Sequence, residues 1–459
     1  IYCRPSCPTP VRPKRANMRF FATPAGAQQA GFRSCKRCAP DSTPGSPEWN
    51  RRDDLVARAV RAIDDGEIDR VGVAGLADRL GVSARHLQRV LTEEIGTGPN
   101  ALARARRARA ARVLIETTTI PFAQISLATG FGSVRQFNDT IAAVFASTPS
   151  QMRRQASSLH RAHNDWVPVR LSYRPPLAAA ELLRWLRLHA VAGAEEVAGT
   201  TYRRSLRLPG GVGVVEIDLA SSTHPYLPTR FRLQSLADLP QAINRVRRLL
   251  DLDADPAVIG NDLSHDECMA SLVGATPGLR SPGEASGTDA AVRAVLHQQV
   301  SLASAKSIAA RLVAEHGIEL ADPVGQVRYA FPSAAVWARA DPGDLGLPSS
   351  RAEAIVNLGA ALHAGWVDLS PWADRSQAVE AMQRVKGIGP WTANVVAAKA
   401  LADPDAFGSG DLALLRQSAS LGLPGEPSAL ESHADRWRPW RSYAMHHLWN
   451  AYLNEQETQ

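Results

Sequence analysis

The stretch on which the fold of this chain depends is Val385-Lys386-Gly387-Ile388-Gly389-Pro390-Trp391-Thr392-Ala393. Two glycines one residue apart, between segments with helical patterns, let the backbone turn sharply with its amide groups exposed. Such amides can hold a DNA phosphate without many basic side chains. A plain helix–glycine–helix turn is the alternative. The pattern favours a helical hairpin in which Lys386, Gly387 and Gly389 contact DNA.

A carboxylate follows this motif at a fixed distance. Asp411 lies 22 residues beyond Gly389, in Asp405-Ala406-Phe407-Gly408-Ser409-Gly410-Asp411-Leu412. It is placed to cap a helix that starts at Leu412. It is also the residue type needed to stabilise the positive charge that builds on a sugar when the bond to its base breaks. Together the hairpin and Asp411 resemble the helix-hairpin-helix DNA glycosylase superfamily, in which an Asp at this spacing is the catalytic carboxylate.

The carboxyl-terminal region carries a closer resemblance. Arg436-Trp437-Arg438-Pro439-Trp440-Arg441-Ser442-Tyr443-Ala444, followed by His447-Leu448-Trp449, is similar to the AlkA type of 3-methyladenine DNA glycosylase II. The resemblance implies a base pocket lined by Trp185, Trp391 and Trp449, although large aromatics also fill cores. Trp391 stands where lyase-competent relatives carry a Schiff-base Lys, which implies a monofunctional enzyme. It also implies a monovalent cation at the hairpin, and no cysteine cluster follows the motif to hold an iron–sulfur centre.

Two positions depart from the AlkA pattern. Val395 replaces a pocket Tyr, and Gln299 replaces the apolar wedge that fills the gap left by a flipped base. Glutamine can occupy that gap but unstacks bases less strongly than an apolar side chain. These departures bear on DNA affinity and on the range of bases excised.

Four of the five cysteines lie in the first 38 residues, as Cys3, Cys7, Cys35 and Cys38, and Cys268 lies far from them. Two close pairs joined by a short spacer match a tetrahedral zinc site. A metal site, rather than a disulfide framework, is typical of a reducing compartment. Arg, Lys and Pro surround the quartet, so we expect a zinc module with a cationic, DNA-facing surface.

Two helix-turn-helix units are predicted behind this module. The first runs from Leu76 to Leu87 with its turn at Gly81, and the second covers residues 125–140. A solvated helical bundle is the alternative, but two units joined by the basic helix 104–112 resemble the AraC-type DNA-binding domain. Two readers about one helical turn apart would contact successive major grooves. The side chains placed to reach DNA are Arg85, His86, Gln88, Arg89, Arg135, Gln136 and Asn138.

Residues 1–155 as a whole resemble the amino-terminal part of the Ada family of alkylation-response proteins. The matching residues are Ile1-Tyr2-Cys3-Arg4-Pro5-Ser6-Cys7-Pro8 and Gly31-Phe32-Arg33 before Cys35-Lys36-Arg37-Cys38. The resemblance implies that Cys3 accepts a methyl group from a methylated DNA phosphate and that Arg4 contacts DNA. A thiolate on zinc stays nucleophilic at neutral pH, and its methylation removes a negative charge that repels phosphate. A closed structural zinc is the alternative.

Length and charge fit a fusion of these parts. The 459 residues suffice for several domains, and residues 1–162 carry 25 Lys and Arg against 13 Asp and Glu, whereas the rest carry 27 against 32. We expect a multidomain fold, mainly α with an α+β part. The predicted domains are a zinc module (1–45), an AraC-type reader (50–155), a mixed α/β domain (167–280) with a hairpin at Pro209-Gly210-Gly211, and an all-α helix-hairpin-helix domain (281–459).

The sequence thus predicts a sensor of DNA methylphosphotriesters that activates transcription and also hydrolyses the glycosidic bond of 3-methyladenine and similar lesions. Two rivals are a regulator whose rear half only recognises damaged DNA, and an AraC-type regulator that senses metal. Double-stranded DNA and RNA polymerase are the expected partners of a monomer located in the bacterial cytoplasm at the nucleoid. No membrane span or signal peptide is evident. Because the chain begins at Ile1, an upstream segment is expected.

Overall fold

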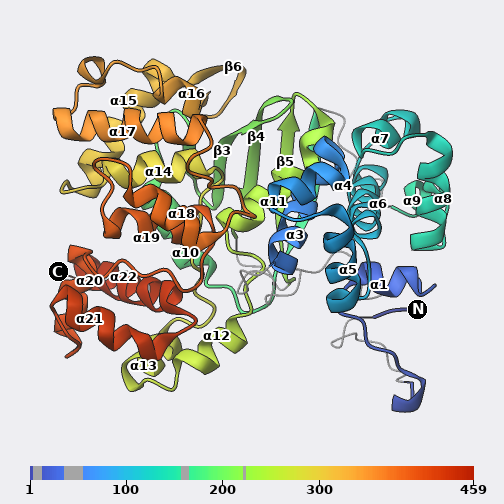
Figure 1. Cartoon of the computed structure of the whole chain (residues 1–459), viewed down its shortest axis with the longest axis horizontal. Helices are drawn as coiled ribbons and strands as arrows, with labels where there is room; N and C mark the ends of the chain where they lie inside the picture. Colours follow the sequence, from blue (N-terminus) through green and yellow to red (C-terminus); the bar gives the residue numbers. More distant parts are fainter. Residues whose placement is uncertain (4–12, 36–54, 157–164, 221–223, 459) are drawn as a thin grey trace.

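The structure is a computed structural model of the 459-residue chain, and it describes residues 1–3, 13–35, 55–156, 165–220 and 224–458. The amino-terminal helices lie at one side of the molecule, a twisted sheet lies in the middle, and a large helical domain lies at the other side (Figure 1). Three predicted site residues, Arg4, Cys7 and Cys38, fall outside the described residues. In the described part of the chain, no helix is long and apolar enough to cross a membrane.

Two separate stretches of the amino-terminal module, at residues 1–3 and 33–35, lie side by side. Tyr2 pairs with Ser34 in a parallel bridge, in which Tyr2 N donates to Arg33 O at 2.8 Å and Cys35 N donates to Tyr2 O at 3.1 Å. This bridge sets Cys3 beside Cys35. The described helices of the module are η1 (Arg15–Asn17) and α1 (Pro24–Gln29).

Two helix-turn-helix units follow, as predicted, and they share the long helix α6. Gly81 and Gly130 take the positive φ values that the turns require, +72° and +81°. Ser83 and Ser133 cap the helices that follow, by accepting hydrogen bonds from His86 N and Gln136 N. The helices are α3 (Leu55–Asp64), α4 (Glu67–Arg79), α5 (Ala84–Ile95), α6 (Pro99–Thr117), α7 (Phe122–Ala128), α8 (Val134–Phe145) and α9 (Pro149–Gln155).

The basic helix α6 packs against most of the other helices of this domain. Several of its apolar side chains, among them Ala108 and Leu114, are fully buried. Arg106 and Arg107 both pair with Asp69 of α4. These arginines therefore stabilise the packing of the helices rather than adding to an exposed cationic stripe.

An antiparallel sheet with strand order β1-β5-β4-β3-β2 forms the middle of the molecule. Phe231 lies opposite both Val167 and Val215 in the ladder and is completely buried. The predicted hairpin is confirmed, because Leu208 pairs with Gly211 across Pro209 and Gly210. The elements are β1 (Trp166–Ser172), α10 (Ala179–His189), β2 (Glu195–Ala198), β3 (Thr201–Leu208), β4 (Gly211–Asp218), β5 (Tyr226–Leu233), η4 (Leu236–Asp238) and α11 (Leu239–Leu249).

The helical domain encloses its own apolar core, to which Val295, Ala393 and Leu448 contribute. Its elements are α12 (Pro256–Leu263), α13 (Glu267–Ala275), α14 (Gly287–Leu296), α15 (Leu302–His316), β6 (Ile318–Val324), β7 (Val327–Ala330), α16 (Ala334–Trp337), η5 (Pro342–Leu345), α17 (Ser349–His363), α18 (Arg375–Gln383), α19 (Pro390–Ala400), α20 (Leu412–Ser420), α21 (Pro427–Ala434), η6 (Asp435–Trp437) and α22 (Arg441–Thr458).

This domain differs from the all-α expectation in one place. The antiparallel strands β6 and β7 form a short hairpin, and Leu320 and Val327 pack against Val214 of the central sheet. Apolar and polar residues alternate over only a few positions in these strands. The sequence therefore did not distinguish them from the helical patterns on both sides. Helices α12 and α13 also join this core, although they lie within the range predicted for the α/β domain.

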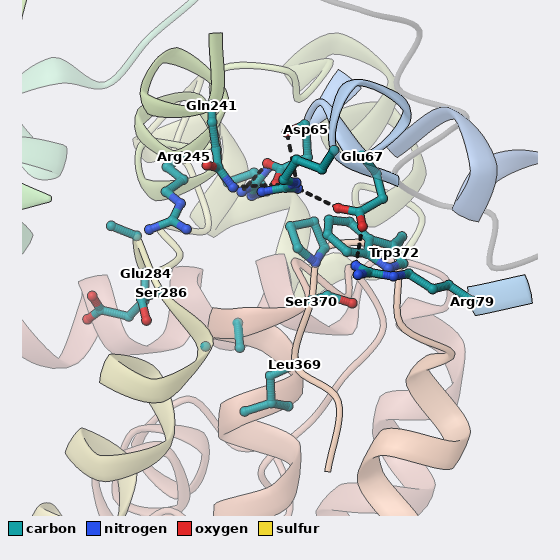
Figure 2. Close-up of a pocket in the computed structure, with 16 residues that line it drawn as sticks. Asp65, Glu67, Arg79, Gln241, Arg245, Glu284, Ser286, Leu369, Ser370 and Trp372 are labelled. Atoms are coloured by element: carbon teal, nitrogen blue, oxygen red, sulfur yellow. Dashed lines mark hydrogen bonds and ion pairs between the residues drawn. The ribbon is translucent and has the colours of Figure 1, made fainter. Parts of the chain in front are cut away.

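The reader and the helical domain meet directly. Arg58 Nε and Arg61 Nε of α3 donate to the backbone oxygens of Trp372 and Pro371, at 3.0 and 2.8 Å. Beside this contact lies a cavity of about 340 Å³, lined by residues of α4, α11 and the loops before α14 and α18 (Figure 2). Asp65 at its edge accepts from Gln241 Nε2 at 2.8 Å and pairs with Arg248 at 3.2 Å. None of the predicted catalytic or base-pocket residues lines this cavity.

Candidate active site and DNA-reading surfaces

The predicted helical hairpin is formed by α18, the turn at residues 384–389, and α19. Gly387 has a φ of +94°, and a Cβ atom there would lie 2.5 Å from Ala354 Cβ. Gly389 caps α19 with an ordinary φ of −90°, and a Cβ atom there would meet nothing within 4 Å. The fold therefore requires glycine at position 387, whereas Gly389 faces open space that a ligand can approach.

The loop between α14 and α15 is fastened to this hairpin. Gln298 Nε2 donates to Gly387 O at 3.1 Å and to Thr392 Oγ1 at 2.9 Å. The neighbouring Gln299 is exposed and holds a left-handed backbone with φ of +54°. Non-glycine residues rarely adopt this conformation, and it is found where function demands a particular side-chain direction. The predicted wedge thus projects beside the hairpin, and its anchor, Gln298, had no predicted role.

Lys386, the predicted phosphate contact, is exposed at the tip of the hairpin. Its Nζ lies 2.9 Å from Glu353 Oε2, and both side chains face solvent. A surface pair of this kind contributes little and exchanges readily for another anion. Lys386 is therefore accessible to a phosphate that displaces Glu353.

Asp411 is half-buried at the amino end of α20. Its Oδ1 accepts from Leu414 N at 3.0 Å, so the capping role is confirmed. The same oxygen accepts from Trp449 Nε1 at 3.2 Å. Among the described residues, no group donates a hydrogen bond to Oδ2. One oxygen is thus fixed by the protein, and the other is left for a ligand.

Trp185 of α10 and Trp449 of α22 form an aromatic wall next to this carboxylate. Their ring centroids are 5.5 Å apart with an interplanar angle of 28°. Rings this close are in direct contact, which leaves no room for a base between them. His446 packs edge-on against both rings. A base would therefore lie outside the pair rather than inside it.

Trp391, the third predicted pocket residue, lies on α19 against the loop that leads to Asp411. A Cβ atom at Gly408 would lie 3.3 Å from Trp391 Cδ1 and 3.4 Å from Val395 Cγ2. The buried indole nitrogen Nε1 has no hydrogen-bond partner within the described residues. Val395, where the family pattern has Tyr, fills the space beside Gly408 with an apolar side chain.

Lys399, for which the sequence predicts no role, lies against the same aromatic wall. Its Nζ lies 4.5 Å from the centroid of the Trp185 ring and 5.5 Å from that of Trp449. It donates to Pro282 O at 2.8 Å and lies 2.7 Å from His446 Nε2. Burial lowers the pKa of Lys399 to about 7, against the opposing attraction of Glu284. A lysine near the end of a helix usually faces solvent, so nothing in the sequence marked this one.

The reader presents most of its predicted contact residues to solvent. Arg85, Gln88 and Arg89 are exposed on α5, and His86 is half-buried. Arg89 pairs with Glu93 at 2.8 Å, and Gln136 Oε1 accepts from Gly132 N at 3.0 Å, so these two are partly engaged within the protein. On α8, Arg135, Gln136 and Asn138 are exposed.

The described part of the cysteine quartet is consistent with a metal site. Cys3 is exposed, Cys35 is half-buried, and the Tyr2–Ser34 bridge holds their backbones side by side. No group of three or more metal-ligating side chains occurs within the described residues, and Cys7 and Cys38 lie outside them. Paired backbones suit two of the four thiolates of a tetrahedral zinc.

Family comparisons agree with this division. Residues 1–41 match the metal binding domain of Ada, residues 76–155 match a helix-turn-helix domain, and residues 168–286 match the AlkA N-terminal domain. The 3-methyladenine DNA glycosylase of Archaeoglobus fulgidus superposes with a TM-score of 0.55 at 20% identity, over 62% of this chain and 98% of that one. The fold and site thus define a DNA-reading protein whose rear half has the helix-hairpin-helix glycosylase fold.

Two curated relatives show the family to which the chain belongs. The "Probable bifunctional transcriptional activator/DNA repair enzyme AlkA" of Mycobacterium tuberculosis is 47% identical over 453 residues, which cover 98% of this chain and 90% of that protein. DNA-3-methyladenine glycosylase 2 of Escherichia coli is 34% identical over 285 residues, covering 61% of this chain and 95% of that protein. The chain belongs to the family of bifunctional AlkA proteins, which join an Ada-like regulatory half to a glycosylase half.

Proposed function

We propose that this protein excises 3-methyladenine and similar alkylated bases from duplex DNA by hydrolysing the N-glycosidic bond. The observation that carries the proposal is the arrangement of Asp411, whose Oδ1 is held by Leu414 N and Trp449 Nε1 while Oδ2 is left for substrate. A carboxylate so oriented stabilises the positive charge that develops on the deoxyribose and orients the attacking water. The alkylated purine is cationic and leaves readily, so a separate general acid is less necessary.

The surrounding residues suit this reaction. The aromatic rings of Trp185, Trp391 and Trp449 are electron-rich and attract a cationic base. Because position 391 is Trp, the hairpin offers no Schiff-base amine there, so we expect a monofunctional enzyme that leaves an abasic site. Gly387, Gly389 and Lys386 would hold a phosphate, with a monovalent cation at the hairpin, and Gln299 would fill the gap in the duplex.

The test is base release from duplex DNA methylated by a simple alkylating agent, measured with the wild type and with Asp411→Asn. Asparagine keeps an oxygen that can cap α20 and accept from Trp449, so we expect folding to survive while release falls at least about a hundredfold. Asp374→Asn is a matched control, because Asp374 caps α18 by accepting from Gln377 N at 3.0 Å. Equal release by wild type and Asp411→Asn would remove the catalytic assignment. No release by the wild type would leave a regulator that only recognises damage.

For the amino-terminal half we propose a single-use methylation sensor. Cys3, Cys7, Cys35 and Cys38 would hold Zn²⁺, and the exposed Cys3 would take the methyl group from a DNA phosphotriester. The sulfur forms a bond to the methyl carbon, and the phosphate oxygen leaves as a diester anion. The methylated module, less repelled by phosphate, would then bind DNA more tightly and activate transcription by RNA polymerase, with the protein acting as a monomer in the cytoplasm.

Mass spectrometry of peptides after exposure to methylphosphotriester DNA checks this step. We expect a gain of one methyl group on Cys3, abolished by prior removal of zinc with a chelator and absent in Cys3→Ser. Unmodified Cys3, or methylated protein with unchanged DNA affinity, would reduce the quartet to a structural zinc site.

A further inference from the structure

Lys399 is enclosed by several elements that carry charged or titratable groups. His446 of α22 lies 2.7 Å from its Nζ, and His189 of α10 stacks on Trp185 at 3.9 Å. The other groups near Lys399 are Asp251 after α11, Glu284 before α14, Arg293 on α14, and His297 at the end of α14. Lys399 thus lies over both rings of the aromatic wall, and Trp449 of that wall donates a hydrogen bond to Asp411.

Most of these neighbours keep one charge state near neutral pH. Burial lowers the pKa of His189 and of His446 well below the usual value, and that of His297 to about 4, so all three are neutral. Arg293 and Glu284 pair with each other at 3.0 Å. Burial raises the pKa of Asp251 to about 6. Burial raises the pKa of Glu284 as well, and Asp251 is mostly ionised above pH 6.5. Lys399, whose pKa is about 7, is the cation of this set whose charge changes between about pH 6.5 and pH 8.5.

We propose that Lys399 is a specificity-determining residue, whose ammonium group lies against the rings of Trp185 and Trp449 and so disfavours cationic alkylated bases relative to neutral damaged bases. This inference rests on the proposed glycosylase function. A ring that already attracts one cation attracts a second less, and the two cations also repel each other. A neutral base experiences neither effect.

The charge on Lys399 decides how the choice between cationic and neutral bases changes with pH. Below its pKa Lys399 is charged and opposes a cationic base at the wall. As pH rises through about 7 the charge is lost, so excision of a cationic base increases relative to that of a neutral base. 3-Methyladenine in DNA owes its charge to the methyl group rather than to a bound proton, so the substrate itself keeps its charge across this range.

The experiment measures single-turnover release of 3-methyladenine from methylated DNA and of hypoxanthine, a neutral base, from an oligonucleotide duplex, at several pH values between about 6.5 and 8.5. For the full-length wild type, the ratio of the two rates should rise about threefold to tenfold across this range, the size of one cation–π contact. Lys399→Met should hold the high ratio at every pH, and Lys399→Arg, which stays charged, should hold the low one.

Three outcomes would count against the proposals, and they are distinguishable. A wild-type ratio that is independent of pH overturns the role of Lys399, as does an unchanged transition in Lys399→Met. Release of neither base by the wild type overturns the glycosylase function itself. Hypoxanthine release by each variant reports whether that variant has folded. If Lys399→Met does not fold, the comparison of the wild type with Lys399→Arg still tests the role of Lys399.

Discussion

At the scale of single residues, Asp411 combines a structural and a chemical role in one side chain. Oδ1 caps α20 and accepts from the indole of Trp449, so the carboxylate cannot rotate freely. Spacing in the sequence identified both roles without choosing between them. The structure makes them compatible, because each role uses a different oxygen. The consequence is that substitutions at this position separate stability from activity.

We predict that Asp411→Ala lowers the free energy of unfolding by about 1 kcal/mol, the usual cost of losing a helix cap. Asp411→Asn should change it by only a few tenths of that amount, because asparagine also caps well. Both variants should lose base release. Urea denaturation of the two variants and the wild type measures the difference. Equal stability of all three would mean that the cap contributes nothing to α20.

At the scale of elements, the hairpin between α18 and α19 depends on two glycines for different reasons. Gly387 combines a φ of +94° with backbone packed against Ala354, whereas Gly389 has an ordinary backbone in open space. Gln298 then fixes the α14–α15 loop to the same turn. The hairpin and the loop carrying Gln299 therefore form one unit on which a DNA strand can be held.

Gly387→Ala should destabilise the helical domain by about 1–3 kcal/mol, because the left-handed backbone and the close contact with Ala354 are both unfavourable for alanine. Gly389→Ala should leave thermal stability nearly unchanged, and yet weaken DNA binding, since its methyl group would occupy the space where a phosphate approaches. Thermal unfolding and binding to a duplex with an abasic-site analogue test the pair. Similar melting of both variants would contradict the assignment of Gly387.

At the scale of the whole molecule, the reader and the glycosylase half are joined by a charged junction. Asp65, almost fully buried, contacts Gln241 and Arg248 of α11, and Asp65 and Gln241 are labelled in Figure 2. Arg58 and Arg61 of α3 donate to the backbone oxygens of Trp372 and Pro371. Burial alone raises the pKa of Asp65, but Arg248 and Arg245 outweigh it and hold the pKa below its usual value. The two halves are thus held at a defined orientation.

Asp65→Ala should cost about 3 kcal/mol of stability at neutral pH, because Arg248 and Gln241 would lose a buried partner. Since the pKa of Asp65 is lowered by folding, its contribution is complete above the unfolded value of 3.8 and is lost as the pH falls through the folded value. Wild type should therefore approach the variant in stability below about pH 4. Urea unfolding at several pH values measures this. Asp64→Ala, which removes a pair with Arg109 at 3.3 Å nearer the surface, is the control and should cost under about 1 kcal/mol.

The amino-acid sequence alone determined the local elements and the chemistry they carry. Gly81, Gly130 and Gly387 mark turns because only glycine adopts those backbone angles easily, and Ser83, Ser133 and Asp411 mark helix starts because short polar side chains cap them. Such signals act over a few residues, so they can be recognised without a tertiary structure. The hairpin β6–β7 was not predicted, because its alternation of apolar and polar residues is too short to be distinguished from the helical patterns around it.

Only the tertiary structure decided which of these residues meet. Trp185 stacks directly on Trp449, so these two predicted pocket residues form a single aromatic wall. Trp391, the third, packs against Gly408 instead. The side chain of Lys399 on α19 reaches Trp185 of α10 and His446 of α22, and burial there gives it a pKa of about 7. Neither fact has a local signal, because contact between distant segments and the desolvation of a charge arise only when the helices pack together.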